Sequence, residues 1–133
     1  MIIVLDCNAA IEIILKREKE KILRQYVEVS EKVISSELFR IETANVLKKY
    51  VQGNYIEKAR CNEILELAEN LVDEFVPIKE NHLEALYEAI RLNYSAYDML
   101  YLILARNRGA TLLTLDQRLN QIAKKEGIST TTP

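Results

Sequence analysis

Short, wholly apolar runs alternate along the chain with longer segments of helical periodicity. The apolar runs predict strands at residues 1–5, 32–35, 74–78 and 110–114. Helices are predicted over residues 8–16, 18–28, 37–52, 56–72, 81–92, 97–107 and 117–125. Strands that are apolar on both faces and alternate with helices are typical of a parallel sheet with helices on both sides. We therefore predict an α/β protein, a three-layer α/β/α sandwich with a central, mainly parallel sheet of four to five short strands.

The few turn-forming residues fall at the predicted helix ends. The three glycines, Gly53, Gly109 and Gly127, each follow a predicted helix, where a residue with a left-handed backbone is favoured. No repeat or linker interrupts the 133 residues, so we expect a single domain spanning residues 1–133. Residues 129–133 are predicted to form a last short strand or a frayed tail.

Composition narrows the class of protein. Hydrophobic residues make up 49 % of the chain, enough for a core, and the formal net charge is −2. A protein that binds nucleic acid over its whole surface is usually basic, so RNA binding would need a local basic patch or metal ions. No apolar run is long enough to span a membrane, and the N-terminus lacks a basic leader. We expect a reduced, cytoplasmic protein in which Cys7 and Cys61 are small buried hydrophobic residues.

The aspartates lie where a parallel α/β sheet forms its working site, at the carboxyl ends of the strands. Asp6 directly follows the first predicted strand, and Asp116 follows the last with one residue between them. Asp98 opens a very apolar helix, whereas Asp73 lies in an ordinary loop. Each of the first three also suits a helix N-cap, alone or in a capping box such as Ser95 with Asp98. The sequence is therefore compatible with two roles for these three aspartates, helix capping and membership of a shared site.

Glu42 is not explained by capping, because it lies in the middle of a predicted helix. It shares a helix face with Leu38 and Val46, at a spacing of four, and so interrupts an apolar stripe. A lone buried carboxylate costs several kcal/mol unless it is paired, protonated or bound to a metal. If the carboxylates converge, Mg²⁺ or Mn²⁺ would relieve their repulsion, and the usual use of such a site is phosphodiester hydrolysis. The absence of histidine or cysteine from the set argues against zinc.

Four segments, in order along nearly the whole chain, resemble the PIN-domain ribonucleases, especially VapC-type toxins. They are VLDCNAAI, ELFRIETANVLKKY, SAYDMLYLILARNRGA and LLTLDQRL. The resemblance implies that Asp6, Glu42, Asp98 and Asp116 are catalytic, metal-binding carboxylates. It also implies that Asn8 and Thr114 orient these carboxylates or a metal-bound water, although Asn8 also suits a helix-start hydrogen bond and Thr114 an ordinary strand position.

The same resemblance implies an activity and partners. The family cleaves single-stranded or looped RNA, leaving a 5′-phosphate and a 3′-hydroxyl, and a toxin of this kind is blocked by an antitoxin that inserts a basic side chain or a peptide into the acidic groove. A homodimer is also expected, and the apolar helix at residues 99–105 is either part of its surface or core.

Other polar and aromatic residues are weaker candidates. Arg118, beside Asp116, is the preferred contact for RNA phosphates. His82 has no acid–base partner nearby in the sequence and is expected to be structural or exposed to solvent. Tyr94, Tyr97 and Tyr101 surround Asp98 and suit either base stacking or, more readily, packing in a core or dimer.

Three other functions are alternatives to a metal-dependent ribonuclease. A non-catalytic PIN-like module that binds RNA or protein is the main alternative, against which the intact carboxylate set argues. A phosphotransfer domain needs an acidic pair or a D-x-D triplet, which here reads Asp6-Cys7-Asn8. A dinucleotide-binding domain needs a G-x-G-x-x-G motif, which the sequence lacks.

Overall fold

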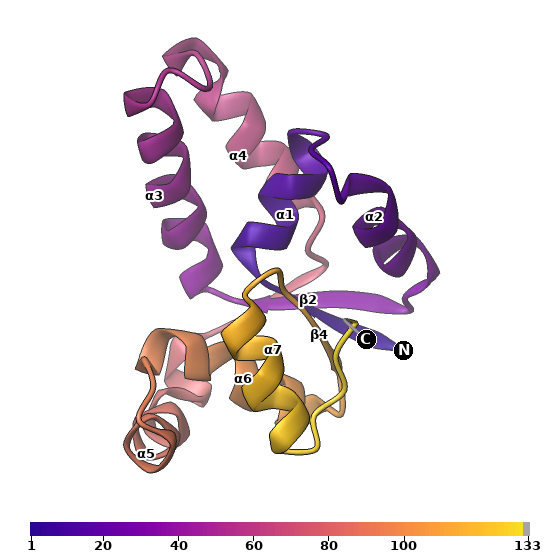
Figure 1. Cartoon of the computed structure of the whole chain (residues 1–133), viewed down its shortest axis with the longest axis vertical. Coiled ribbons are helices and arrows are strands. Elements are labelled where there is room, and N and C mark those ends of the chain that lie inside the picture. Colours follow the sequence, from indigo (N-terminus) through magenta and orange to yellow (C-terminus); the bar gives the residue numbers. More distant parts are fainter. Residues whose placement is uncertain (132–133) are drawn as a thin grey trace.

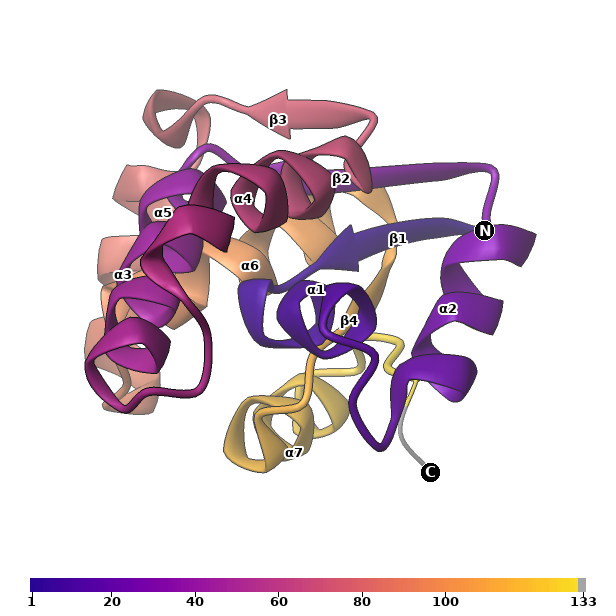
Figure 2. The ribbon, with the colours of Figure 1, turned by 90° about the horizontal axis from the view of Figure 1, so that it is seen from above.

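Four short strands form the centre of the fold. They are β1 (Ile2–Leu5), β2 (Lys32–Ser36), β3 (Glu74–Val76) and β4 (Thr111–Leu113). In the computed structural model, which describes residues 1–131, they lie in the order β3-β2-β1-β4, and every neighbouring pair is parallel (Figure 2). In this register, Val4 of β1 lies opposite Ile34 of β2 and Leu112 of β4. The predicted parallel sheet of four short strands is confirmed.

Helices cover both faces of this sheet, as predicted for a three-layer sandwich (Figure 1). One layer holds α1 (Cys7–Ile14), α2 (Glu20–Val29), α3 (Leu38–Gln52) and α4 (Cys61–Asn70). The other holds α5 (His82–Leu92), α6 (Ala96–Arg108) and α7 (Gln117–Lys125). Successive side chains of a strand point to opposite faces, so Ile3 and Leu5 pack against the first layer and Val4 against the second. None of the helices in the described part of the chain is both long and apolar enough to cross a membrane.

Helix α6 lies in the core. Every residue from Met99 to Ala105 is buried, because α6 packs against β1, β2 and β4 on one side and α5 and α7 on the others. The alternative that these residues form a self-association surface is therefore wrong, and their apolar character comes from the core. Tyr101 is fully buried here and carries a polar hydroxyl into this layer.

Two predicted elements end or begin elsewhere in the structure. The predicted strand at residues 74–78 stops at Val76, because Pro77 has no N–H to donate to the sheet and a 3₁₀ turn, Ile78–Glu80, follows it. The predicted helix at residues 56–72 is shorter, since a 3₁₀ turn over Lys58–Arg60 precedes α4.

Two of the three glycines end their helices with the predicted left-handed backbone, and the third does not. Gly109 and Gly127 have φ angles of 59° and 73°, in the left-handed region that favours glycine. At the end of α3 the left-handed residue is Asn54, with φ 61°, whereas Gly53 has φ −85°. Of the predicted final strand, Thr130 forms one parallel bridge with Leu112. Thr132 and Pro133 lie outside the described residues.

Candidate active site

The sheet topology brings the two ends of the chain together at the carboxyl edge of the sheet. Asp6 follows β1, and Thr114 and Asp116 follow β4, which is the neighbour of β1. Glu42 lies in the second turn of α3 and Asp98 in the first turn of α6, which belong to the two layers on either side of that edge. Four carboxylates from distant parts of the sequence therefore reach the same end of the fold.

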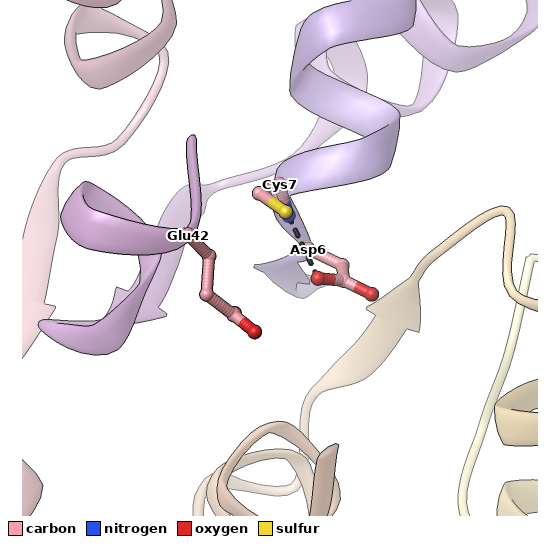
Figure 3. Close-up of side chains that lie close together, drawn as sticks. All are labelled: Asp6, Cys7 and Glu42. Carbon is pink, nitrogen blue, oxygen red and sulfur yellow. Dashed lines mark hydrogen bonds between the residues drawn. The ribbon is translucent and has the colours of Figure 1, made fainter. Parts of the chain in front are cut away.

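Asp6 and Glu42 form the centre of the acidic cluster. Ligand atoms of Asp6, Cys7 and Glu42 all lie within 4.8 Å of one another (Figure 3). Asp6 is only 5 % exposed, and Glu42 is half-buried. Cys7 is buried, as expected. The sequence pattern did not predict that its thiol lies beside the two carboxylates, although its position directly after Asp6, at the start of a helix, could have indicated this.

A hydrogen-bond network fixes the Asp6 carboxylate. The Thr114 hydroxyl donates to Oδ2 of Asp6 at 2.7 Å, and the Asn8 amide donates to the same oxygen at 3.3 Å. The backbone N–H of Cys7 donates to Oδ1 at 2.8 Å. Asn8 is held in turn by the N–H of Leu115, which donates to its side-chain oxygen at 2.9 Å. Asn8 and Thr114 thus link β4 to the start of α1 and hold one carboxylate in a single orientation.

Burial and mutual repulsion shift the pKa values of these carboxyl groups. Burial raises the pKa of Asp6 to about 7, the hydrogen bond from Thr114 opposes this, and the charges of Glu42 and Asp98 raise it further. Burial also raises the pKa of Glu42, opposed by a hydrogen bond that the Tyr101 hydroxyl donates to Oε1. The charge of Asp98 acts in the same direction on Glu42.

Asp98 connects Asp116, the fourth carboxylate, to this cluster. Burial and then the charge of Asp116 raise the pKa of Asp98, and nearby Arg118 lowers it. Asp98 and Asp116 lie outside the group of atoms within 4.8 Å of one another. The charge of Asp98 acts on Asp6 and Glu42, and that of Asp116 acts on Asp98. The four carboxylates form one repulsive series, from Asp6 through Glu42 and Asp98 to Asp116.

Helix capping accounts for part of this arrangement. Asp6 caps α1, and Oδ1 of Asp116 accepts from the N–H groups of Arg118 and Leu119 at 3.0 and 3.1 Å, so it caps α7. The Ser95–Asp98 capping box is not formed. Ser95 caps α6 by accepting from the N–H of Tyr97, whereas the Asp98 carboxylate accepts no hydrogen bond from residues 1–131. Capping is therefore compatible with a shared site for two of the aspartates and does not explain Asp98.

Two hollows flank the carboxylates. Glu42 lines a cavity of about 490 Å³ together with Lys48 and Tyr97. Asp98 lines another, of about 260 Å³, together with Arg118 and other residues. The Arg118 guanidinium lies 4.4 Å from the ring centroid of Tyr94, where it faces this second cavity. Each of these two cavities therefore combines one of the carboxylates with a basic side chain, Lys48 in the first and Arg118 in the second.

Of the three tyrosines around Asp98, only Tyr101 belongs to the core, with its hydroxyl donating to Glu42. Tyr97 is 65 % exposed and Tyr94 is half-buried at the surface. His82 is exposed, and its Nδ1 pairs with the carbonyl of Lys79. It belongs to α5 and is no part of the acidic cluster, as expected.

The donor set suits a hard divalent cation. Carboxylate oxygens are the ligands that Mg²⁺ and Mn²⁺ prefer, and a positive ion relieves the repulsion that raises the carboxyl pKa values. Burial and the neighbouring carboxylates raise the pKa of the Cys7 thiol, so in the metal-free protein it stays protonated at neutral pH.

Comparisons with known proteins agree with this description. A family model described as PIN domain matches residues 3–125. The fold is similar to the crystal structure of PAE2754 from Pyrobaculum aerophilum, with a TM-score of 0.71 and 20 % identity, covering 96 % of this chain and 87 % of that one. It is also similar to VapBC2 from Rickettsia felis, crystallised bound to a DNA fragment from their promoter, with a TM-score of 0.68 and 16 % identity over 98 % of this chain and 97 % of that one. A search of curated proteins found no match.

Proposed function

The chain belongs to the PIN domain family, and on that basis we propose that it is a metal-dependent endoribonuclease that serves as the toxin of a type II toxin–antitoxin pair. The observation that carries this proposal is the approach of the Asp6 and Glu42 carboxylates to within 4.8 Å of each other, with Asp98 close enough to shift the pKa of both carboxyl groups. We assign the whole chain, residues 1–133, to this one domain.

Each residue of the pocket has a proposed role. Asp6, Glu42, Asp98 and Asp116 would hold a divalent cation, Mg²⁺ or Mn²⁺. When bound, the cation supplies positive charge that offsets the carboxylates and draws the RNA phosphate into the pocket. Asn8 and Thr114 keep the Asp6 carboxylate in one orientation, and the buried Tyr101 hydroxyl does the same for Glu42.

Substrate and partner follow from the charges around the pocket. Arg118 faces the cavity beside Asp98, where it would pair with an RNA phosphate next to the one that is cut. We also propose a cognate antitoxin, because VapBC2 of Rickettsia felis, which has a similar fold, was crystallised with promoter DNA and because an acidic pocket suits a basic side chain of a partner.

The proposal is tested by cleavage of a labelled single-stranded RNA by the purified protein, with Mn²⁺ or with EDTA. We expect cleavage only with the metal, and a loss of at least about 100-fold in rate for Asp98→Asn, because the lost carboxylate charge no longer supports the cation. Asp73→Asn is the matched control, since Asp73 is the one aspartate outside the pocket and its structural hydrogen bond from the Val33 N–H can be kept by the amide oxygen. If the wild type and Asp98→Asn bound the RNA equally well and neither cut it, the non-catalytic RNA-binding module would be favoured.

A homodimer is proposed through α5. Four large apolar side chains on this helix, Leu83, Leu86, Tyr87 and Ile90, are 59 %, 48 %, 64 % and 68 % exposed. Their spacing of three and four residues puts them on one helix face, and an apolar patch of this kind is unusual on a monomer. The same face of a second copy is the occupant that we propose, because a self-complementary apolar stripe can pack against its own symmetry mate.

Ile90→Glu is expected to convert the dimer into a monomer, because the new charge would be buried without a partner. We expect the dimer dissociation constant to rise at least about 30-fold, measured by light scattering across a dilution series. Ile22→Glu, which places the same charge at an exposed isoleucine of α2, should leave the dimer unchanged. A wild-type protein that is monomeric at high concentration would contradict this proposal.

A further inference from the structure

A third hollow lies away from the carboxylates, where α1 ends and the chain turns from α3 to α4. Its volume is about 500 Å³. It is lined by Leu15, Arg17, Tyr50, Tyr55, Ile56 and Arg60. We call this hollow the aromatic pocket. Its walls are two tyrosines and two arginines, a combination that none of the roles given above uses.

The two tyrosines of the aromatic pocket are held in place by a tight turn. Their rings lie with centroids 5.9 Å apart at an angle of 55°, and the N–H of Tyr55 donates to the carbonyl of Tyr50 at 2.8 Å. Asn54 takes the left-handed conformation that folds the chain back. A Cβ on Gly53 would come within 2.8 Å of the Tyr55 ring, so glycine leaves the space that the ring fills. Tyr55 is 80 % exposed, so one face of its ring is open to a ligand.

The positive charge of the aromatic pocket comes chiefly from Arg60, because Arg17 pairs with the Glu12 carboxylate at 3.7 Å. The Arg17 guanidinium lies 5.5 Å from the ring centroid of Tyr50 and donates to its hydroxyl. Arg60 is exposed and has no carboxylate within 4.0 Å among residues 1–131; the only other arginine of which this holds is Arg118, in the cavity beside Asp98. The two arginines without a carboxylate partner in the described part of the chain thus both line hollows: Arg60 the aromatic pocket, and Arg118 the cavity beside Asp98.

The aromatic pocket and the acidic cluster lie at opposite ends of one pair of helices. Asp6 caps the start of α1 and Leu15 its end, while Glu42 and Tyr50 lie two turns apart on α3. A helix rises about 1.5 Å per residue, so the two sites are roughly 12 Å apart along these helices. Both helices rise from the same edge of the sheet (Figure 1). A buried cluster of Ile11, Leu47 and Ile64 joins them.

We propose that the aromatic pocket binds one nucleobase and its phosphate in the single-stranded RNA that flanks the cut. This inference rests on the proposed nuclease function. A flat aromatic wall stacks on any base, and arginine pairs with phosphate and stacks on π systems. The chain has a net charge of −2, so RNA cannot be held by its overall field and needs a local site of this kind.

The test uses a reporter placed in the aromatic pocket. The chain contains no tryptophan, so Tyr55→Trp introduces a single indole whose fluorescence a stacked base quenches. The titration uses a short single-stranded RNA in the Asp98→Asn background, so that binding is read without cleavage. We expect saturable quenching, and adding Arg60→Ala should weaken binding about tenfold and lower the slope of log affinity against log salt by about 1.

Matched variants show whether the ring itself binds. By anisotropy of a labelled RNA, Tyr55→Ala should weaken binding roughly tenfold and Tyr55→Phe should keep it, because stacking needs the ring and not the hydroxyl. Lys21→Ala removes an exposed charge on α2 and should change nothing.

The outcomes separate this inference from the nuclease proposal. Unchanged RNA binding by Tyr55→Ala and Arg60→Ala overturns the aromatic pocket as an RNA site, even if the wild type cuts RNA and Asp98→Asn does not. If RNA binding requires both Tyr55 and Arg60 but the wild type cuts no RNA with Mn²⁺, the aromatic pocket is supported as an RNA site and the nuclease proposal is refuted. Quenching of the Tyr55→Trp protein by an acidic glutamate–tyrosine copolymer but not by RNA overturns the inference in favour of a peptide site.

Discussion

Asp6→Asn is expected to abolish RNA cleavage and to stabilise the metal-free protein at the same time. Cleavage should fall by about 10³-fold or more, since the variant loses the most buried of the charges that would hold the cation. Stability should rise, because an ionised Asp6 is both buried and repelled by Glu42 and Asp98. At pH 8 in EDTA we expect a gain of about 2 kcal/mol, which is the relief of that charge less the cost of the two hydrogen bonds that Thr114 and Asn8 donate to Oδ2 and that an amide NH2 cannot accept.

The measurement pairs a cleavage assay with urea unfolding followed by circular dichroism. Asp73→Asn again serves as the control, because it removes an equal charge far from the pocket and should neither stop cleavage nor stabilise the protein. An Asp6→Asn variant that is inactive and also unfolded at neutral pH would mean that Asp6 acts as a structural cap, contrary to the expectation.

The second large effect is a fall in the stability of the metal-free protein as the pH rises from about 4 to about 7. The pKa of Asp6 is raised from 3.8 to about 7 in the folded protein, so over this range the folded state holds a proton that the unfolded state has released. The contribution of Asp6 to the free energy of unfolding is therefore largest below pH 4. It declines as the pH rises towards 7 and no longer changes above pH 7. A shift of this size corresponds to roughly 4 kcal/mol.

Divalent metal should reverse this trend. Mn²⁺ binds the ionised carboxylates and not the protonated ones, so its stabilising effect should grow between pH 5 and pH 8. The free energy of unfolding, measured in urea at several pH values with EDTA and with Mn²⁺, gives both curves. A metal-free wild type whose stability follows the same curve as Asp6→Asn would contradict the proposed burial of this charge.

Much of the fold was predictable because the strands are buried on both faces. A strand buried on both faces is mostly apolar, as β1 is, and such runs are easy to separate from helices with one apolar face. The location of the site also follows a general rule, since the carboxyl ends of parallel strands share one edge, and this predicted that Asp6 and Asp116 reach the same edge. The strand order, which makes β1 and β4 neighbours, comes from the structure. Glu42 was identified because a charge inside an apolar stripe demands an explanation.

Other features depend on contacts that the sequence pattern does not contain. The apolar positions of α5 have ordinary helical spacing, which does not tell an outward face from an inward one, and only the structure shows that they face solvent. The ring position of Tyr55 depends on the backbone of Gly53 and Asn54. Hydrogen bonds such as that from Tyr101 to Glu42 join residues 59 positions apart and follow from packing alone.

The pairing of β1 with β4 also has a consequence for synthesis of the protein on the ribosome. Thr114, whose hydroxyl orients Asp6, lies 108 residues after it, so this hydrogen bond cannot form until the chain as far as Thr114 has left the ribosome. Under the proposed function, a nascent chain that ends before Thr114 would lack an ordered Asp6 and would not cut the messenger that encodes it.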